Sequence, residues 1–263
     1  MRRILTFVIA TRNRFLTLEK IIKEIGRLDI EITIIDDNSN IENKRKNFLI
    51  SKYFKKINYF YLKKNYGQSF ALNVGLRNCK TPYVWFFDDD DYVSRYSVTN
   101  VINFLKKRKI KGLLIPMFVV YKNKIIDKVF PNVRDHKFEK LIKQQQKVNT
   151  SCSIFETNSI KKLRGWDENL KAATDTDLFL RFSKNHKFDV FHKASVKINY
   201  SSENRVTNNL SKQLVCKMQF LLKHGKILSI KRIFYYIFTL VTLYPLFYNI
   251  KQNLKLVRLK KNV

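Results

Sequence analysis

The chain has 263 residues, and its 52 Lys and Arg against 21 Asp and Glu give a formal charge of +31. The hydrophobic content of 45% is enough for a packed core, which excludes a wholly disordered chain. Three widely spaced Cys residues without a Cys-x-x-Cys pair support neither a disulfide framework nor a cysteine-built zinc site, so a reducing compartment is the simplest interpretation.

The first predicted elements are a strand, a helix and a second strand. Residues 4–10 form an apolar run that is too short for the core of a signal peptide, and we predict a buried strand there. Residues 18–28 carry apolar side chains at helical spacing, and residues 30–35 alternate as a strand does before the polar turn at 36–40. This order is typical of a βαβ unit.

The same pattern then repeats. Residues 57–62 are predicted to form a strand, residues 69–77 a helix of small residues, and residues 83–87 a further strand. Asp36-Asp37 and Asp88–Asp91 therefore each follow a predicted parallel strand. In open α/β sheets, ligands bind at the edge where such strands end.

The rest of the first 208 residues continues this domain without a linker rich in Pro, Gly or Ser and without an internal repeat. The pattern predicts helices over residues 96–107, 135–147 and 174–184, a hairpin of 113–121 with 125–130, and strands over 152–155, 188–192 and 196–200. We therefore expect an α/β domain over residues 1–208 and a separate tail over residues 209–263.

The tail is predicted to be helical, basic and in contact with a membrane. Residues 190–263 contain 14 Lys and Arg against one acid, a net charge of +13. An amphipathic helix over residues 210–222 precedes an uncharged run of 18 residues at 233–250, which Pro245 interrupts. These features favour an interfacial anchor facing anionic lipid over a membrane span. The alternative is a helical hairpin that packs on the domain or forms an oligomer interface.

Aspartates are concentrated at a few places in this basic chain. Nine of the 13 lie at positions 36–37, 88–91, 167, 175 and 177. Packed like charges cost free energy unless a cation or a hydrogen-bond donor compensates them. The four carboxylates of Asp88–Asp91 suit a hard divalent cation, Mg²⁺ or Mn²⁺, which also takes phosphate oxygens from a substrate. The alternative is a solvated acidic turn that caps the next helix.

Three further segments carry residues that suit a binding or catalytic site. Asp36 and Asp37 can accept hydrogen bonds from a base or a ribose, or form an ordinary turn. The cations and backbone N–H groups of Lys63–Gly67 suit a phosphate or a nucleotide, or form a basic loop. Asp175 and Asp177 begin a predicted helix, where a carboxylate provides a general base or simply favours the helix dipole.

Taken in chain order, these segments resemble glycosyltransferase family 2 with the GT-A fold over residues 4–200. The segments that carry the resemblance are Ala10–Arg14, Ile34–Ser39, Asn65–Gly67, Ala71–Gly75, Phe86–Asp91, Gly165–Glu168 and Asp175–Arg181. The resemblance implies a Rossmann-like mixed, mainly parallel sheet flanked by helices, with the basic helical tail as an appendage. It also implies an inverting enzyme of bacterial surface polysaccharide synthesis. Such an enzyme transfers a sugar from a nucleotide diphosphate donor to a glycan or lipid-linked acceptor, and we expect the donor to be UDP-linked.

The resemblance further implies roles for single residues. Asp175 would be the general base that deprotonates the acceptor hydroxyl, and Asp90 would hold the divalent cation on the diphosphate. Asp37, with Asp36, would contact the nucleotide base, and Asp88 the ribose side. The residues expected to bind the nucleotide sugar are Thr11, Arg12, Asn13, Asp36, Asp37, Asn65, Gly67, Asp88 and Asp89.

Three positions depart from the family pattern. Thr174 replaces the usual Glu before the proposed base, which removes a charge there. Arg12 replaces an aromatic residue that stacks on the nucleotide base, although a guanidinium plane also stacks. Tyr200 lies in the region where many relatives have a His near the metal.

Two other functions stay open at this point. A nucleotidyltransferase would share the sheet and the metal carboxylates but would release pyrophosphate. A nucleic-acid-binding protein would suit the charge of +31, but the chain has no recognition motif and its acid clusters would repel phosphates, so we expect no nucleic acid partner. The expected partners are a nucleotide sugar, an acceptor and an anionic membrane surface, in the cytoplasm or at the cytoplasmic face of the membrane. The sequence leaves the oligomeric state open.

Overall fold

The structure is a computed structural model that describes residues 3–54, 56–131, 149–170, 173–200, 219–220 and 222–224. The chain divides into two units, Met1–Glu168 with Asp175–Ser202, and Asn169–Thr174 with Glu203–Val263. The predicted helix at 135–147, the apolar run at 233–250 and nearly all of the predicted tail lie outside the described residues. The predicted boundary between residues 208 and 209 stays a prediction.

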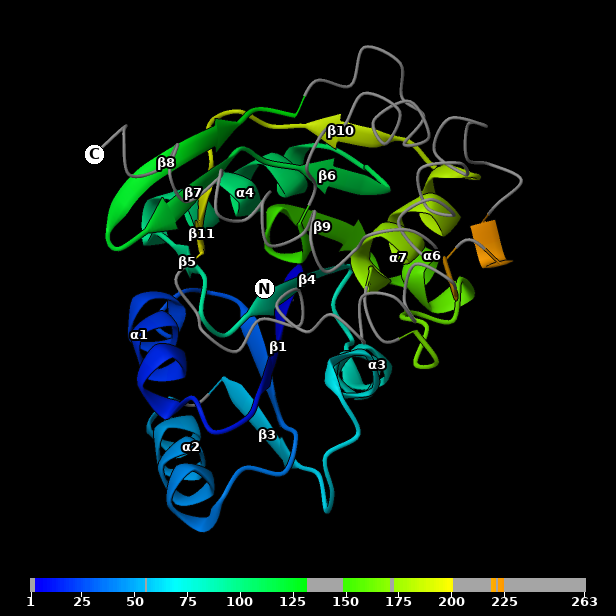
Figure 1. Cartoon of the computed structure of the whole chain (residues 1–263). Helices are drawn as coiled ribbons and strands as arrows, with labels where there is room; N and C mark the ends of the chain where they lie inside the picture. The colour runs from blue at the N-terminus through cyan, green and yellow to red at the C-terminus, as the bar shows by residue number, and fades with distance from the viewer. Residues whose placement is uncertain are drawn as a thin grey trace, which may run out of the picture. The chain divides into compact units, whose positions relative to one another are not determined.

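The main sheet of the first unit has seven strands in the order β10-β6-β9-β4-β1-β2-β3 (Figure 1). Strands β3, β2, β1 and β4 are parallel neighbours, and only β9 runs antiparallel, between β4 and β6. This is the mixed, mainly parallel sheet that was predicted. The strands are β1 (Leu5–Thr11), β2 (Glu31–Asp36), β3 (Ile57–Tyr61), β4 (Tyr83–Asp88), β6 (Gly112–Leu114), β9 (Ser153–Glu156) and β10 (Phe188–Val190).

A second sheet of four strands has the order β5-β11-β7-β8. Its strands are β5 (Tyr92–Val93), β7 (Met117–Tyr121), β8 (Lys124–Val129) and β11 (Val196–Asn199). The prediction of one strand over residues 113–121 is wrong, because β6 belongs to the main sheet and β7 to this one. The break falls at Pro116, which has no N–H to continue a ladder and whose carbonyl instead accepts the N–H of Val196 at 3.0 Å.

Helices cover both faces of the main sheet (Figure 1). On one face, α1 (Phe15–Ile25), α2 (Ile41–Tyr53) and α4 (Arg95–Lys107) contribute buried side chains to one large core cluster. The other helices are α3 (Gln68–Asn78), α6 (Thr157–Lys162) and α7 (Thr174–Ser183), and a short 3-10 helix, η1, spans Thr150–Cys152. Each predicted helix inside the described ranges is present, whereas α2 and α6 were not predicted.

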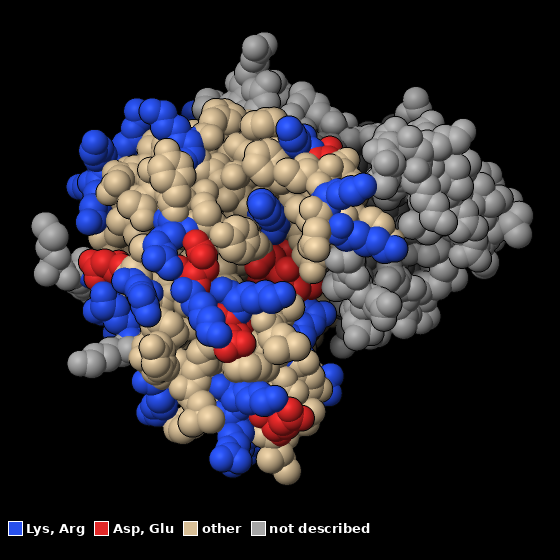
Figure 2. All heavy atoms as spheres, turned by 90° about the vertical axis from the view of Figure 1, so that its left-hand side faces the viewer, with Lys and Arg blue, Asp and Glu red and all other residues tan. Residues whose placement is uncertain are grey.

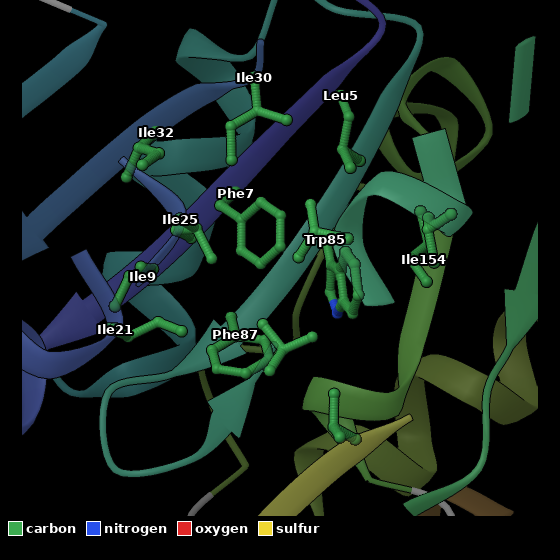
Figure 3. Close-up of a cluster of buried hydrophobic side chains, with 14 of the residues drawn as sticks. Leu5, Phe7, Ile9, Ile21, Ile25, Ile30, Ile32, Trp85, Phe87 and Ile154 are labelled. Atoms are coloured by element: carbon green, nitrogen blue, oxygen red, sulfur yellow. The ribbon is translucent and has the colours of Figure 1, made fainter. Parts of the chain in front are cut away.

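The core beside α1 is built by the alternation of β1. Leu5, Phe7 and Ile9 all point to this side and are fully buried. The ring of Phe7 lies 4.6 Å from that of Trp85 on β4, and side chains of both strands meet Ile21 and Ile25 of α1 there (Figure 3). Burying each such side chain contributes about 1.5–3 kcal/mol, which holds β1 beside β4, the strand that leads into Asp88–Asp91.

Helix α2 has apolar residues on two opposite sides, which explains why it was not predicted. Ile50 is buried, whereas Ile41, Phe48, Leu49 and Tyr53 are exposed. The helix begins at the cap residue Asn40, whose side chain accepts the N–H of Asn43 at 2.9 Å. Because both sides are partly apolar, the sequence shows no helical periodicity there.

Helix α3 packs closely on β1, and this contact gives a first prediction. A Cβ added at Gly75 would lie 2.2 Å from Cγ1 of Val8. We expect Gly75→Ala to lower the free energy of unfolding by about 1–3 kcal/mol, because overpacking outweighs the gain in helix propensity. Denaturant unfolding measures the change. Adding Val8→Ala should recover much of it, and additive losses in the double variant would contradict the contact.

Candidate active site

The carboxyl ends of β1, β2 and β4 form the edge of the sheet that carries the predicted site. In the ladder, Thr11 is paired with Asp36, and Ala10 with Asp88. The hydroxyl of Thr11 donates to Asp89 at 2.6 Å, so the end of β1 is tied to the turn after β4. The structure thus brings the two N-terminal acid clusters and Thr11 to one edge, as the βαβ pattern predicted.

Asp36 is fully buried, and its carboxylate is held by three hydrogen bonds from the chain itself. Its carboxylate accepts hydrogen bonds from the Ser39 N–H, the Asn47 amide and the Tyr59 hydroxyl, each at 2.8 Å. Burial and the neighbouring Asp36 carboxylate raise the pKa of the Tyr59 hydroxyl. Asp36 therefore holds the turn between β2 and α2, whatever it contributes to a nucleotide.

Asp37 fixes the loop that leads into α3. Its two carboxylate oxygens accept the N–H groups of Tyr66 and Gly67, each at 2.8 Å. Two of the backbone donors that the sequence offered to a phosphate are therefore used by Asp37. Gly67 has a φ of +94°, which favours glycine, and the space where a Cβ would stand is open. Asn65 lies exposed in the same loop.

Arg12 and Asn13 are exposed in the turn after β1. Asn13 has a φ of +56°, and its backbone N–H donates to the Ser39 hydroxyl at 2.9 Å. Its side-chain oxygen accepts the N–H of Asn40 at 2.8 Å. The turns after β1 and β2 are therefore joined, while the Arg12 side chain stays on the surface beside the edge.

Arg14 lies between two carboxylates of the Asp88–Asp91 run. Its guanidinium donates to Asp89 at 3.0 Å and to Asp90 at 3.2 Å. Burial raises the pKa of Asp89 to about 6, although the charge of Arg14 and the hydrogen bond from Thr11 oppose that rise. Arg14 was quoted in the segment that resembles the family, but its pairing was not predicted.

Asp88 and Asp91 carry charge that the chain compensates poorly. Burial, followed by repulsion from Asp90, raises the pKa of Asp88 to about 7, and Gln68 donates to its carboxylate at 2.7 Å. Asp91 accepts the N–H of Asn199 at 3.0 Å, but its buried Oδ2 has no hydrogen-bond partner among the described residues. Burial and repulsion from Asp88 raise the pKa of Asp91 well above its ordinary value.

Asp175 begins α7 close to this cluster. Its negative charge is one of the lesser causes that raise the pKa of Asp88, so the two carboxylates lie near each other. Burial also raises the pKa of Asp175 itself, while the N–H of Thr176 donates to its Oδ1 at 2.7 Å. A carboxylate with a raised pKa near an acid cluster has the basicity that proton abstraction needs. Cys152 lies near both Asp91 and Asp175, and burial raises its pKa to about 12, so it stays a neutral thiol.

Two clamps, neither of which was predicted, hold the Gly165–Glu168 loop. The Asn73 side chain donates to the Trp166 carbonyl at 2.9 Å and accepts the Trp166 N–H at 2.8 Å. Arg181 is paired with the buried Asp177 at 2.8 Å and donates to the Gly165 carbonyl at 2.7 Å. The Asp177 carboxylate is therefore engaged in an internal ion pair, which leaves Asp175 as the candidate base of the two.

The acids at this edge fit a divalent cation that a substrate would help to hold. Among the described residues, no group of three His, Cys, Asp or Glu side chains is arranged to hold a metal ion. Mg²⁺, however, is usually bound by one or two carboxylates together with substrate phosphates. The unpartnered Oδ2 of Asp91 and the repulsion around Asp88 mark a surplus of negative charge, and Asp90 lies in the same turn.

The raised pKa values predict how stability depends on pH. Between about pH 4 and pH 7 the folded chain binds more protons than the unfolded chain at Asp88 and Asp89, so its stability should fall as the pH rises. We expect a lower melting temperature at about pH 7.5 than at about pH 5, measured at fixed ionic strength. Asp88→Asn should flatten the profile, and an equally steep profile in that variant would contradict the assignment.

Residues 6–162 match glycosyl transferase family 2, and this match covers more than half of the chain. The chain belongs to this family. The family members are glycosyltransferases, so this chain is an enzyme of that class, as its site residues suggested.

Three curated relatives are named for teichoic acid or for a poly(ribitol-phosphate). A teichoic acid poly(glycerol phosphate) polymerase of Staphylococcus epidermidis is 26% identical over 62% of this chain and 23% of its own length. Bacillus subtilis GgaB, a minor teichoic acid biosynthesis protein, is 28% identical over 67% of this chain and 20% of its own length. Staphylococcus aureus TarP, a poly(ribitol-phosphate) β-N-acetylglucosaminyltransferase, is 26% identical over 70% of this chain and 58% of its own. The chain thus matches between a fifth and less than two thirds of the length of each of these relatives.

Solved glycosyltransferases share the fold. Staphylococcus aureus TarS in complex with UDP-GlcNAc has a TM-score of 0.67 at 16% identity and covers 89% of this chain and 71% of its own. The mannosyltransferase PcManGT of Pyrobaculum calidifontis, in complex with GDP-Man and Mn²⁺, has a TM-score of 0.63 at 13% identity, over 91% of this chain and 70% of its own. These likenesses confirm the predicted GT-A fold. Within the ranges that the structure describes, no helix is both long and apolar enough to cross a bilayer.

Proposed function

We propose that the chain transfers a sugar from a UDP-linked donor to a hydroxyl group of a bacterial surface polymer or of its lipid-linked precursor, with inversion at the anomeric carbon. The observation that carries this proposal is the acid-lined edge of a glycosyl transferase family 2 sheet, where Thr11 is hydrogen-bonded to Asp89 and where the charge of Asp175 contributes to the raised pKa of Asp88. A donor bound along the sheet edge would then have its anomeric carbon between the acids of β4 and the start of α7.

The donor side of the proposed site is the edge formed by β1, β2 and β4. Thr11, Arg12 and Asn13 follow β1, and Asn65 and Gly67 lie in the loop that Asp37 holds. Arg12 is exposed beside the edge, where its guanidinium plane can stack on a base. We assign the nucleotide base to Asp37, whose turn Asp36 supports from the interior, and the ribose side to Asp88. The diphosphate would be bound through the divalent cation, because carboxylates alone would repel it.

Asp90 would hold the divalent cation, Mg²⁺ or Mn²⁺, whose chemistry is to neutralise the charge that develops on the leaving nucleoside diphosphate. Mn²⁺ in the PcManGT complex supports this assignment. Arg14 already places one positive charge against Asp89 and Asp90, so part of the cluster is neutral before any donor binds.

In the proposed reaction, Asp175 takes the proton of the acceptor hydroxyl as its oxygen bonds to the anomeric carbon. The bond from that carbon to the diphosphate breaks, and its electron pair leaves on the nucleoside diphosphate. Attack from the face opposite the leaving group inverts the configuration. Because burial raises the pKa of Asp175, the carboxylate gains basicity for this step.

The names of the relatives and the positive charge of the chain both favour a polyanionic acceptor. The name of GgaB refers to teichoic acid and that of TarP to a poly(ribitol-phosphate), and both polymers carry a phosphate in each repeat. A chain with a charge of +31 attracts such a polyanion. We propose that the basic tail over residues 209–263 keeps the enzyme at the cytoplasmic face of the membrane, where such a polymer is made.

A donor screen tests the proposal. The full chain is incubated with Mn²⁺ and UDP-GlcNAc, UDP-GalNAc, UDP-Glc or GDP-Man, and the released nucleotide is measured. We expect release of a nucleoside diphosphate from at least one UDP-linked sugar, increased by a polyol phosphate acceptor. Release of pyrophosphate from a nucleoside triphosphate and a sugar phosphate would instead identify a nucleotidyltransferase, and no turnover of any donor would overturn the proposal.

A further inference from the structure

A groove between α1 and α2 lies on the side of the sheet that carries the large core. It has a volume of about 580 Å³, and none of the acids of the sheet edge lines it. Its least exposed lining is apolar and comes from Phe15, Ile50 and Phe54. Four cations and one acid complete its polar lining, namely Lys23, Arg27, Lys46, Arg95 and Glu19.

The solvent side of α2 continues this groove as an apolar surface. Ile41 is 87% exposed and Tyr53 is 73% exposed, and Phe48 and Leu49 lie between them on the helix. Leu16, on the first turn of α1, is also exposed. A soluble helix normally turns charged residues to water, so this surface suits a partner that accepts apolar side chains.

Cations are interspersed among these apolar residues. Lys44, Arg45 and Lys52 are exposed on α2, and Arg27 is exposed at the end of α1. Arg27 and Arg45 form no ion pair with any described residue, whereas Lys23 and Lys46 pair with acids on their own helices. Figure 2 looks onto this side of the molecule and shows that Lys and Arg are spread over it and are more prominent than the acids that lie among them.

We propose that this groove and the solvent side of α2 bind an acidic phospholipid in a bilayer, so that the α1–α2 face docks on an anionic membrane. The phosphate would lie against Arg27, Lys23 and Lys46 at the rim, and an acyl chain against Leu49 and the apolar lining. A surface that carries both exposed apolar residues and Lys and Arg gains from burying apolar area at the bilayer boundary and from attraction to anionic lipid.

This occupant fits the surface better than a protein does. Charged residues, and Lys above all, are depleted from the centres of protein interfaces, but here Lys44 and Lys52 are mixed with the apolar residues. A second copy of the chain that docked with the same face would bring like charges together. The face belongs to the catalytic unit and is independent of residues 209–263 and of the proposed donor and acceptor.

A tryptophan at position 49 reports on insertion directly. Leu49→Trp is made in the full chain, with Ile125→Trp on β8 as the matched exposed control, since Ile125 is 47% exposed and Leu49 is 56% exposed. The native Trp85 and Trp166 are buried and give a constant background. Vesicles of phosphatidylcholine with brominated phosphatidylglycerol should quench the added fluorescence at position 49 and not at position 125. No quenching at 49, or equal quenching at both positions, would overturn the proposal.

A charge reversal tests the headgroup contact. Lys23→Glu with Arg27→Glu should weaken the association with phosphatidylglycerol vesicles at least tenfold in co-sedimentation, and raised salt should remove the difference. Lys124→Glu with Lys128→Glu, on the exposed side of β8, changes the net charge equally and should weaken it much less. Equal losses in both pairs would show attraction by net charge alone, which would overturn the proposal.

A dimer that Leu49→Ser dissociates, in place of vesicle binding, would identify a second copy as the partner.

Discussion

Asp175→Asn should lower the rate of transfer about 10³-fold and leave donor binding nearly unchanged. The amide keeps the shape of the side chain and can still accept the N–H of Thr176, but it cannot take a proton from the acceptor. The measurement is kcat for transfer, together with the Kd for the donor by calorimetry. In the wild type, activity should fall as the pH drops through the pKa of Asp175. The activity of the variant should not show this fall at low pH.

The matched control for this loss is Asp189→Asn on β10, which makes the same chemical change away from the acid cluster. That variant should turn over at nearly the wild-type rate. A kcat of Asp175→Asn close to that of the wild type would reject Asp175 as the base. A loss of donor binding together with activity would mean that Asp175 holds the donor rather than the acceptor proton.

Asp90→Ala should remove the response to a divalent cation together with nearly all activity. In the wild type, Mn²⁺ with UDP should raise the melting temperature, and more so at about pH 7.5 than at about pH 5, because the acids must be ionised to bind it. The variant should show almost no such shift. The thermal shift measures binding of the cation with UDP and does not depend on catalysis. It therefore distinguishes loss of cation binding from other causes of inactivity.

Asp29→Ala is the matched control. Asp29 is an exposed carboxylate that is paired with Arg3 and Lys56, and it does not belong to the acid cluster. It should keep the full thermal shift. If the wild type kept full activity in excess EDTA, the requirement for a divalent cation would be rejected. If Asp90→Ala kept the shift, another carboxylate of the turn would be the ligand, with Asp91 the first to test.

The strands that position the site could be predicted because they are buried on one or both faces. The alternation and length of β1, β2 and β4 were visible in the sequence, and their shared carboxyl edge followed from the βαβ pattern. Helix α2 could not be predicted from periodicity, since its solvent side is as apolar as its buried side. The break at Pro116 was hidden inside an apolar run that continues on both sides.

The side-chain partners within the site needed the structure. Arg14 and Asn73 lie in segments that the sequence singled out, but their contacts are with residues about 75 and 93 positions away. The same holds for Asp37, whose two oxygens hold the loop at Tyr66 and Gly67. Sequence types and spacing indicate which residues carry chemistry, whereas long-range hydrogen bonds decide which of them hold the scaffold.

The strand order has a consequence for how the molecule is made. The parallel ladder of β1 to β4 needs no later strand, so the first 88 residues can form it during synthesis. In contrast, β6 joins the sheet only through β9, which pairs with β4 and begins some 40 residues after β6. Asp91 receives its backbone hydrogen bond later still, from Asn199. The acid cluster therefore stays open on the growing chain until almost the last strand is in place, and a chain that stopped before β11 would have a formed sheet with an unfinished site.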